Sequence, residues 1–404
     1  GEEGALVEPW LLSASPALAA AAVLAAAGWA AGVSGPVPFL AVLFAEWGFA
    51  RTIRAHVAAV LGGVQRPARE LRVLALLLAR LEREPFEDER LRRLQAALRG
   101  RGARASSRIA ALVSTVTRLE WARNQLFAPV AFALAWNPLH AALVERWRRA
   151  SGREIRGWLE ATAELEALSS LAGYAYEHPE DRFPEIVEAG PERHALLDGE
   201  ALRHPLLRGA VPNEARLGDG GPRALLVSGS NMSGKSTYLR TVGVNVVLAL
   251  AGAPVRAARL RLTPLRVGAT LRIQDSLQAG RSRFYAEITR LKELADLAEG
   301  AAPLLFLLDE ILHGTNSHDR RVGAEAVIRG LVASGAIGFV TTHDLALTEL
   351  ATERGDGRRE PSLANAHFED QVRDGEIAFD YRLRPGVVAH SNALALMRAV
   401  GLRV

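Results

Sequence analysis

The sequence predicts an α/β C-terminal domain built on a parallel sheet, preceded by an all-α domain and by an apolar helical hairpin at the N-terminus. Three observations lead to this fold class. Residues 9–45 contain no charged side chain, residues 57–171 repeat apolar side chains at three- and four-residue spacing, and short apolar runs alternate with helical stretches after about residue 203. The second pattern is typical of amphipathic helices and the third of buried parallel strands. We therefore expect three segments, residues 1–50, 51–200 and 201–404.

Composition narrows the class of protein. The chain has 404 residues, of which 49% are hydrophobic and 23% charged, so it is long enough to bury a large core. Its formal net charge is only +4 and its arginines are dispersed, so bulk charge does not indicate nucleic-acid binding. The absence of cysteine excludes disulfides and cysteine-ligated metal centres.

The uncharged N-terminal run is long enough for one membrane-spanning helix and most of a second. VSGPVP supplies a turn in its middle, Trp10 and Trp47 lie near its outer ends, and Arg51 and Arg54 follow as a cytoplasmic anchor would. An alanine-rich hairpin buried in protein is the alternative, because alanine contributes little to insertion. We expect a membrane hairpin, and hence a membrane-associated protein whose C-terminal domain lies in the cytoplasm.

The region that follows predicts long antiparallel helices, as in ELRVLALLLARLE and IRGWLEATAELEALSSLAGYAY. The stretch RGRGARASS interrupts them and lies within a cluster of arginines at residues 92–108. A solvated turn and a phosphate-contacting patch both fit this cluster, and the general abundance of arginine favours the turn.

The stretch GSNMSGKS fits the pattern G-x-x-x-x-G-K-[ST], with an apolar run before it and an apolar-periodic helix after it. In such a P-loop, backbone N–H groups at the positive end of a helix wrap a phosphate. Lys235, one of two lysines in the chain, would reach the β- and γ-phosphates of ATP, and Ser236 would offer its hydroxyl to Mg²⁺. The residues expected to bind the nucleotide are Gly229, Ser230, Asn231, Met232, Ser233, Gly234, Lys235, Ser236 and Thr237.

Two further apolar runs end in side chains suited to phosphate chemistry. LLFLLDE ends at Asp309, which would hold Mg²⁺, and at Glu310, which would orient and deprotonate the attacking water. GFVTTH ends at His343, which at the end of a buried strand would sense the γ-phosphate. Each signal is weak alone, but together with the P-loop they predict a catalytic site for ATP hydrolysis.

Four motifs, SGSNMSGKSTYLR, LLFLLDEILHGTNSHD, GFVTTHDLALTEL and the run from ANAHFED to MRAVGL, follow one another as in the MutS mismatch-repair family. From about Arg203 onward the chain resembles the ATPase domain of that family, and the helical region resembles its core and lever helices. The resemblance implies an ABC-type P-loop NTPase fold that works as a homodimer with composite sites. It also implies that Ser282, in LQAGRSRFYAE, contacts the γ-phosphate of the partner's site, and that Asp319 lies at the dimer seam.

Some features depart from the family pattern. Ala210 stands where the family often has an aromatic residue that stacks on adenine, and Arg283 stands where it usually has threonine. No mismatch-reading domain of the Phe-x-Glu type is recognised in the sequence, and the short linker between the helical segments leaves little room for a DNA-gripping clamp. We therefore do not expect mismatch reading.

Two functional interpretations follow. The favoured one is a MutS-like ATPase that binds and hydrolyses ATP with Mg²⁺ in a dimer, acts in mismatch-repair-type or DNA-structure sensing, and is tethered by the hairpin. DNA is then a candidate partner. The alternative is a membrane-associated ATPase that couples hydrolysis to a membrane process unrelated to DNA. The lack of an LSGGQ-type transporter signature favours the first.

Overall fold

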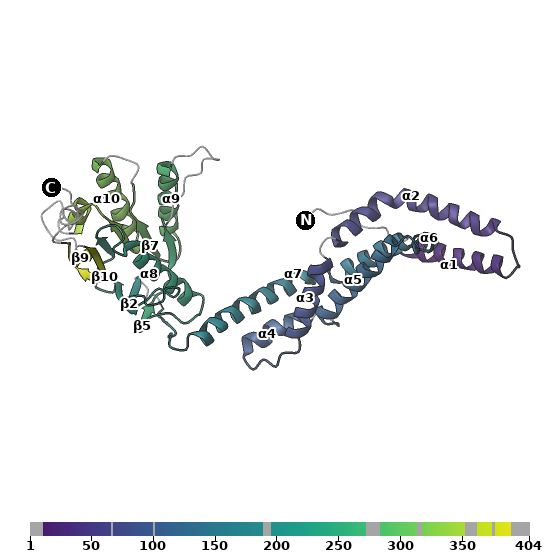
Figure 1. The fold of residues 1–404 in the computed structure, drawn as a ribbon, viewed down its shortest axis with the longest axis horizontal. Coiled ribbons are helices and arrows are strands. Elements are labelled where there is room, and N and C mark those ends of the chain that lie inside the picture. Colours follow the sequence, from purple (N-terminus) through teal and green to yellow (C-terminus); the bar gives the residue numbers. More distant parts are fainter. Residues whose placement is uncertain are drawn as a thin grey trace. The chain divides into compact units, whose positions relative to one another are not determined.

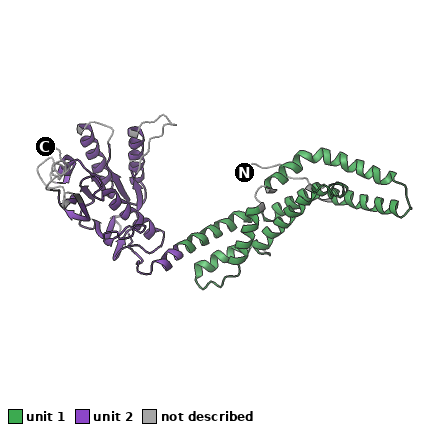
Figure 2. Cartoon of the chain, in the orientation of Figure 1, with its two compact units in different colours: residues 1–170 green, residues 171–404 purple. Residues whose placement is uncertain are grey.

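The computed structural model describes residues 11–65, 68–99, 102–188, 195–271, 283–312, 317–351, 362–373 and 376–388 (Figure 1). The chain divides into two compact units, unit 1 with residues 1–170 and unit 2 with residues 171–404 (Figure 2). The finer division at residues 50 and 200 stays a prediction.

Unit 1 is helical throughout the part of it that the structure describes. Its elements are α1 (Leu11–Ala30), α2 (Val37–Gln65), α3 (Ala68–Leu81), α4 (Glu89–Leu98), α5 (Ala105–Glu120), the short 3₁₀ helix η1 (Trp121–Arg123), α6 (Ala128–Ala133) and most of α7 (Trp136–Glu177). Buried side chains of α3, α4, α5 and α7, including Leu78, Leu98, Ile109 and Trp158, form one apolar cluster. A second cluster joins α2, α5 and α7. The amphipathic spacing in the sequence therefore marks the faces that pack together.

Local polar contacts fix where these helices begin. Asp88 accepts hydrogen bonds from Arg90 N and Leu91 N at the start of α4. The buried carboxylate of Glu82, at the end of α3, accepts hydrogen bonds from Ser106 N (2.9 Å) and Ser106 Oγ (2.5 Å) in the first turn of α5. These bonds satisfy N–H groups that have no partner within their own helices.

The prediction of a membrane-associated protein held by its N-terminal hairpin is wrong. Within the residues that the structure describes, no helix combines the length and the apolar character that a membrane span requires. The turn at residues 31–36 splits the uncharged run, so that α2 reaches Glu46 after only two or three turns and then Arg51. Charged residues inside a span are costly, and α1 consists largely of alanine rather than of the residues that favour insertion most. The cytoplasmic placement and the alternative function in a membrane process both depended on this hairpin, and nothing else supports them.

Unit 2 is a mixed α/β unit, as predicted. Its six-stranded sheet has the order β10-β9-β4-β8-β7-β6, in which all neighbours are parallel except β9 and β10. The strands are β4 (Ala224–Ser228), β6 (Arg266–Ala269), β7 (Leu304–Asp309), β8 (Ile337–Thr342), β9 (Leu363–Arg373) and β10 (Glu376–Pro385). A smaller sheet has the order β1-β5-β2-β3, with β1 (Glu185–Ile186), β5 (Arg259–Leu262), β2 (Leu196–Leu202) and β3 (Asn213–Gly218). The three apolar runs predicted as parallel strands are β4, β7 and β8.

Helices cover both faces of the larger sheet. They are α8 (Lys235–Leu250), α9 (Arg283–Ala298), α10 (Ser317–Ala333) and α11 (Leu345–Thr348), followed by the short 3₁₀ helix η3 (Glu349–Ala351). Alternate residues of β7 enter opposite cores: Leu305 and Leu307 pack with residues of α8, whereas Phe306 and Leu308 pack with residues of α9 and α10. Burial on both faces explains why these strands are continuous apolar runs.

The register of the sheet sets the place of the functional side chains. Ser228, at the end of β4, pairs with Thr342 of β8, and Asp309, at the end of β7, pairs with Thr341. The carboxyl ends of three neighbouring parallel strands therefore meet at one edge, where ligands of open α/β sheets bind.

Candidate functional site

Between β4 and α8 lies the P-loop, residues 229–234, and glycine is needed at both of its ends. Gly229 has φ +151° and Gly234 has φ +104°, conformations that L side chains rarely adopt. A Cβ on Gly229 would lie 3.0 Å from the Phe368 carbonyl oxygen, and one on Gly234 would lie 3.1 Å from the Tyr381 ring. Gly234 is the N-cap of α8 and brings no side chain to its first N–H groups. This helix N-terminus can therefore offer those groups to an anion.

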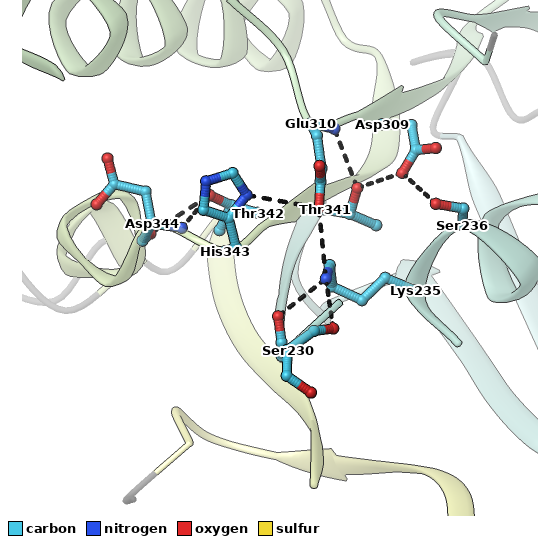
Figure 3. A network of polar contacts seen from close by, with 10 residues as sticks. Ser230, Lys235, Ser236, Asp309, Glu310, Thr341, Thr342, His343 and Asp344 are labelled. Carbon is cyan, nitrogen blue, oxygen red and sulfur yellow. Dashed lines mark hydrogen bonds and ion pairs between the residues drawn. The ribbon is translucent and has the colours of Figure 1, made fainter. Parts of the chain in front are cut away.

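Lys235 is almost completely buried, with 4% of its side chain exposed, yet its charge is surrounded by oxygen atoms. Its Nζ donates hydrogen bonds to Gly229 O (2.9 Å) and Ser230 O (2.8 Å) and lies 3.4 Å from Glu310 Oε1 (Figure 3). The loop and the end of β7 thus hold the ammonium group at the mouth of the P-loop. Each of these contacts can be exchanged for a contact with a phosphate oxygen.

Ser236 and Asp309, the two predicted magnesium ligands, are in direct contact. Ser236 Oγ donates a hydrogen bond to Asp309 Oδ1 (2.9 Å), and Asp309 N donates one to Thr270 Oγ1 (3.0 Å). A hydroxyl and a carboxylate are hard oxygen ligands of the kind that Mg²⁺ prefers. Within the described residues no group of three or more His, Asp or Glu side chains is arranged to hold a metal ion. Mg²⁺ at these two residues would take its remaining ligands from phosphates and water, which is its usual mode of binding.

Glu310 and His343 complete the polar wall of the site. Glu310 has φ +49°, and its N–H is bonded to Thr341 O (3.2 Å) and Thr341 Oγ1 (3.1 Å). Its Oε1 lies between Lys235 Nζ and His343 Nδ1, 3.5 Å from the latter (Figure 3). The predicted base is therefore positioned between a cation and an imidazole that extends the wall toward solvent.

A cavity of about 670 Å³ opens in front of this wall. Asn231, Met232, Gly234, Lys235, Ser236, Thr237 and Glu310 line it on the P-loop side. Gly229, Ser230 and Ser233 are not among the lining residues, and the buried hydroxyls of Ser230 and Ser233 have no hydrogen-bond partner within the part of the chain that the structure describes. Ser282 lies outside the described residues, as does the side chain of Arg283. Asp319 lines a groove between α9 and α10, and its place at a dimer seam stays a prediction.

The rest of the cavity lining includes Ala210, which the sequence singled out, and three residues that it did not identify, Leu207, Val211 and Tyr381. Tyr381 lies on β10, where the pairing with β9 shifts register. Asn213 fixes this strand: its Nδ2 donates to Tyr381 O (2.9 Å) and its Oδ1 accepts from Leu383 N (2.7 Å). No local motif marks Tyr381, because only the sheet topology brings it to the P-loop.

Two titratable groups in the cavity wall have shifted pKa values. Burial raises the pKa of the Tyr238 phenol, whose OH donates to Glu214 O (2.8 Å), so the phenol stays neutral. Burial and the nearby charge of Arg240 lower the pKa of His204, which favours its neutral form. Positive charge in the described wall therefore comes chiefly from Lys235 and Arg208.

Comparison with known proteins shows what this region is similar to. Residues 225–403 match the model of MutS domain V. The chain is 35% identical over 274 residues to the DNA mismatch repair protein MutS 2 of Halobacterium salinarum, an alignment that covers 65% of this chain and 29% of the relative. It is 32% identical over 276 residues to the DNA mismatch repair protein MSH6 of Arabidopsis thaliana, covering 64% of this chain and 20% of the relative. It is also 32% identical over 262 residues to the DNA mismatch repair protein MutS of Natronomonas pharaonis, covering 63% of this chain and 28% of the relative.

The chain thus spans less than a third of the length of these relatives. The matched domain begins within β4 and includes the P-loop, the ends of β7 and β8, and Tyr381. The matches therefore show that residues 225–403 are similar to MutS domain V and that the chain is similar in sequence to DNA mismatch repair proteins of the MutS type.

Proposed function

We propose that unit 2 binds ATP with Mg²⁺ and hydrolyses it. The observation that carries this proposal is the meeting of Lys235, Ser236, Asp309, Glu310 and His343 at one edge of the sheet, beside a cavity of about 670 Å³. Cavities of this size are typical of sites for small molecules and cofactors. The side chains match what phosphoryl transfer to water requires: a phosphate-binding cation, a metal-binding pair and a base.

In this proposal, each group in the wall has one task. Lys235 exchanges its contact with Glu310 for oxygens of the β- and γ-phosphates, and the exchange leaves Glu310 to orient the attacking water and take its proton. Ser236 and Asp309 would hold Mg²⁺, and the ion would supply positive charge to balance the charge that develops on the phosphates. His343 contacts the γ-phosphate from the end of β8.

The adenine base of ATP would occupy the apolar side of the cavity. Ala210 offers no ring there, but Tyr381 presents one beside Gly234. We propose that the Tyr381 ring supplies the aromatic contact that Ala210 does not make.

Replacement of Glu310 by glutamine tests the proposal. Glu310→Gln should bind ATP with similar affinity and lose turnover by about a hundredfold or more, because only the step that needs the base is removed. Binding is measured by calorimetry and turnover by phosphate release. Glu293→Gln, an exposed carboxylate on α9 paired with Arg290, is the matched control and should behave as the parent chain. Unchanged turnover in Glu310→Gln would refute the assignment.

Hydrolysis in a homodimer is a second part of the proposal. If Ser282 completes the partner's site, specific activity should rise with protein concentration. Mixing inactive Ser282→Arg with inactive Lys235→Ala should then restore part of the turnover, since one intact composite site forms. A rate independent of concentration, with no complementation, would indicate a self-sufficient monomer.

The relatives are named as DNA mismatch repair proteins. We propose that this chain also couples ATP binding and hydrolysis to work on DNA of the mismatch-repair or DNA-structure-sensing type. Binding of the full chain to duplex DNA with and without ATP tests this part, and a lack of any ATP-dependent change would contradict it.

A further inference from the structure

Thr341, the penultimate residue of β8, contacts both acidic residues of the candidate site through one hydroxyl. Its Oγ1 donates a hydrogen bond to Asp309 Oδ1 (2.6 Å) and accepts one from Glu310 N (3.1 Å), as Figure 3 shows. The residue is 1% exposed, so solvent does not replace these bonds. A threonine hydroxyl has one proton to donate and lone pairs to accept with, and here both capacities serve the end of β7.

One of the two bonds fixes a carboxylate and the other fixes a backbone conformation. The bond to Oδ1 sets the position of the Asp309 carboxylate, which Ser236 contacts at the same oxygen atom. The bond from Glu310 N, together with the one to Thr341 O, holds the backbone at Glu310 in the left-handed conformation, which is unfavourable for a residue with a side chain. That backbone conformation determines where the Glu310 carboxylate points. One buried hydroxyl therefore orients both the metal-binding and the water-activating carboxylates.

Neighbouring hydroxyls do not duplicate this arrangement. Thr342 Oγ1 accepts a hydrogen bond from Asp344 N (2.9 Å) in the turn that follows β8. Thr270 Oγ1 accepts from Asp309 N (3.0 Å) and so supports the backbone of β7 rather than its carboxylate. Ser236 is itself a candidate metal ligand, and its hydroxyl oxygen would turn to Mg²⁺ when the ion binds. Once Ser236 binds the ion, the hydroxyl of Thr341 is the one among the described residues that still donates to Asp309 Oδ1.

We propose that Thr341 is a positioning residue that couples the Mg²⁺-binding carboxylate of Asp309 to the catalytic carboxylate of Glu310. The inference rests on the proposed ATPase function of the same site. It assigns to Thr341 no contact with the nucleotide, so its loss should affect turnover and the use of Mg²⁺ but not nucleotide binding as such.

The test uses three variants of the full chain. Thr341→Val keeps the shape of the side chain and removes the hydroxyl, and Thr341→Ser keeps the hydroxyl. Thr348→Val is the matched control, because Thr348 is a buried threonine whose hydroxyl, among the described residues, bonds only its own helix, at Leu345 O (2.6 Å). Thermal unfolding first establishes that each variant is folded.

We expect turnover of Thr341→Val to fall about tenfold or more, as for the loss of a buried hydrogen bond to a charged group. The Mg²⁺ concentration for half-maximal turnover should rise several-fold, whereas the affinity for ATP measured in EDTA should stay unchanged. In parallel, the gain in ATP affinity on adding Mg²⁺, measured without turnover, should shrink. Thr341→Ser should restore most of each property, and Thr348→Val should match the parent chain.

Two outcomes would overturn the inference. Parental turnover and Mg²⁺ dependence in Thr341→Val, alongside a turnover defect in Glu310→Gln, would refute the role of Thr341 while leaving the proposed function intact. Equal losses in Thr341→Ser and Thr341→Val would show that packing, not the hydroxyl, is responsible. If the parent chain neither binds nor hydrolyses ATP, the proposed function and this inference fail together, a result distinct from the other two.

Discussion

Each unit of the molecule buries an ionisable side chain, but one of the two has polar partners and the other has none among the described residues. In unit 2, Lys235 is 4% exposed and has two carbonyl oxygens and a carboxylate around its ammonium group. In unit 1, Glu46 of α2 is 2% exposed, and neither of its carboxylate oxygens has a hydrogen-bond partner among the described residues. Burial raises the pKa of the Glu46 carboxyl to about 7.

The difference shows that burial alone does not identify a functional charge. A buried charge is costly unless it is paired and hydrogen-bonded, and a group without partners reduces the cost by giving up its charge. Lys235 keeps partners that a phosphate can replace, so its burial prepares it for a ligand. Glu46 responds instead by holding its proton to a higher pH. The predictions below test each side of this comparison, from the largest expected effect to the smallest.

Stability of unit 1 should depend on pH through Glu46. In the unfolded chain this acid loses its proton near pH 4.5, whereas in the folded chain it keeps it up to about pH 7. The folded state therefore binds more protons in this interval, and the free energy of unfolding falls as the pH rises from 4.5 to 7. The loss should reach about 3 kcal/mol at pH 8.

Tryptophan fluorescence during urea unfolding measures this change, because all seven tryptophans lie in unit 1, between residues 10 and 158. Glu46→Gln should lose less stability between pH 5 and pH 8 than the parent chain. Glu89→Gln, an exposed carboxylate on α4 paired with Arg93, should retain the parental profile. An identical pH dependence of the free energy of unfolding in the parent and Glu46→Gln would contradict the comparison, since it would indicate that Glu46 has a partner.

On the other side of the comparison, Lys235→Ala should weaken ATP binding by about a hundredfold, about 2.7 kcal/mol. Calorimetric titration with ATP and Mg²⁺ checks this value. Lys292→Ala removes the other lysine, which pairs with Asp296 on the exposed surface of α9, and should leave the affinity unchanged. Glu46→Gln should leave it unchanged as well. A loss of ATP affinity in Glu46→Gln would mean that the buried carboxyl of unit 1 also serves nucleotide binding, which would contradict the comparison.

The apolar side of the cavity offers a smaller effect. Tyr381→Ala should reduce ATP affinity about tenfold, because it removes the ring, whereas Tyr381→Phe should keep the affinity close to that of the parent. Tyr176→Ala, an exposed residue of α7 outside this cavity, serves as the control. Equal affinities for Tyr381→Ala and the parent chain would show that the adenine base of ATP does not contact this ring.

The smallest expected effect is that of a mismatch on the affinity for duplex DNA. Candidate contacts in both units are dispersed arginines, which bind phosphates without reading base pairing. Affinity for duplex DNA should fall steeply with salt, and a mismatched duplex should bind less than tenfold, about 1.4 kcal/mol, more tightly than its matched control. A larger ratio in a filter-binding or anisotropy titration would reveal a reading element in the chain.

The parts of the site that a local pattern specifies were predictable from the sequence. Lys235 and Ser236 follow from one contiguous motif, and Asp309 and His343 follow from apolar runs that became neighbouring parallel strands. Tyr381 and Thr341 could not be found in this way, because their positions depend on strand order and register rather than on neighbours in sequence. The N-terminal prediction is wrong for a related reason: an uncharged run predicts a membrane segment, but the turn at residues 31–36 leaves α2 with Glu46 and Arg51 along its length.

The position of β4 has a consequence for how the protein is made. This strand leads into the P-loop. Among the described strands it pairs only with two that are made much later, β8 at residues 337–342 and β9 at residues 363–373. A growing chain therefore exposes an apolar strand with no neighbour until more than a hundred further residues have been added. Such long-range parallel pairing folds slowly and leaves unpaired edges open to aggregation. Nascent chains that end before β9 should thus depend on chaperones and should not yet recognise nucleotide, whatever their P-loop sequence.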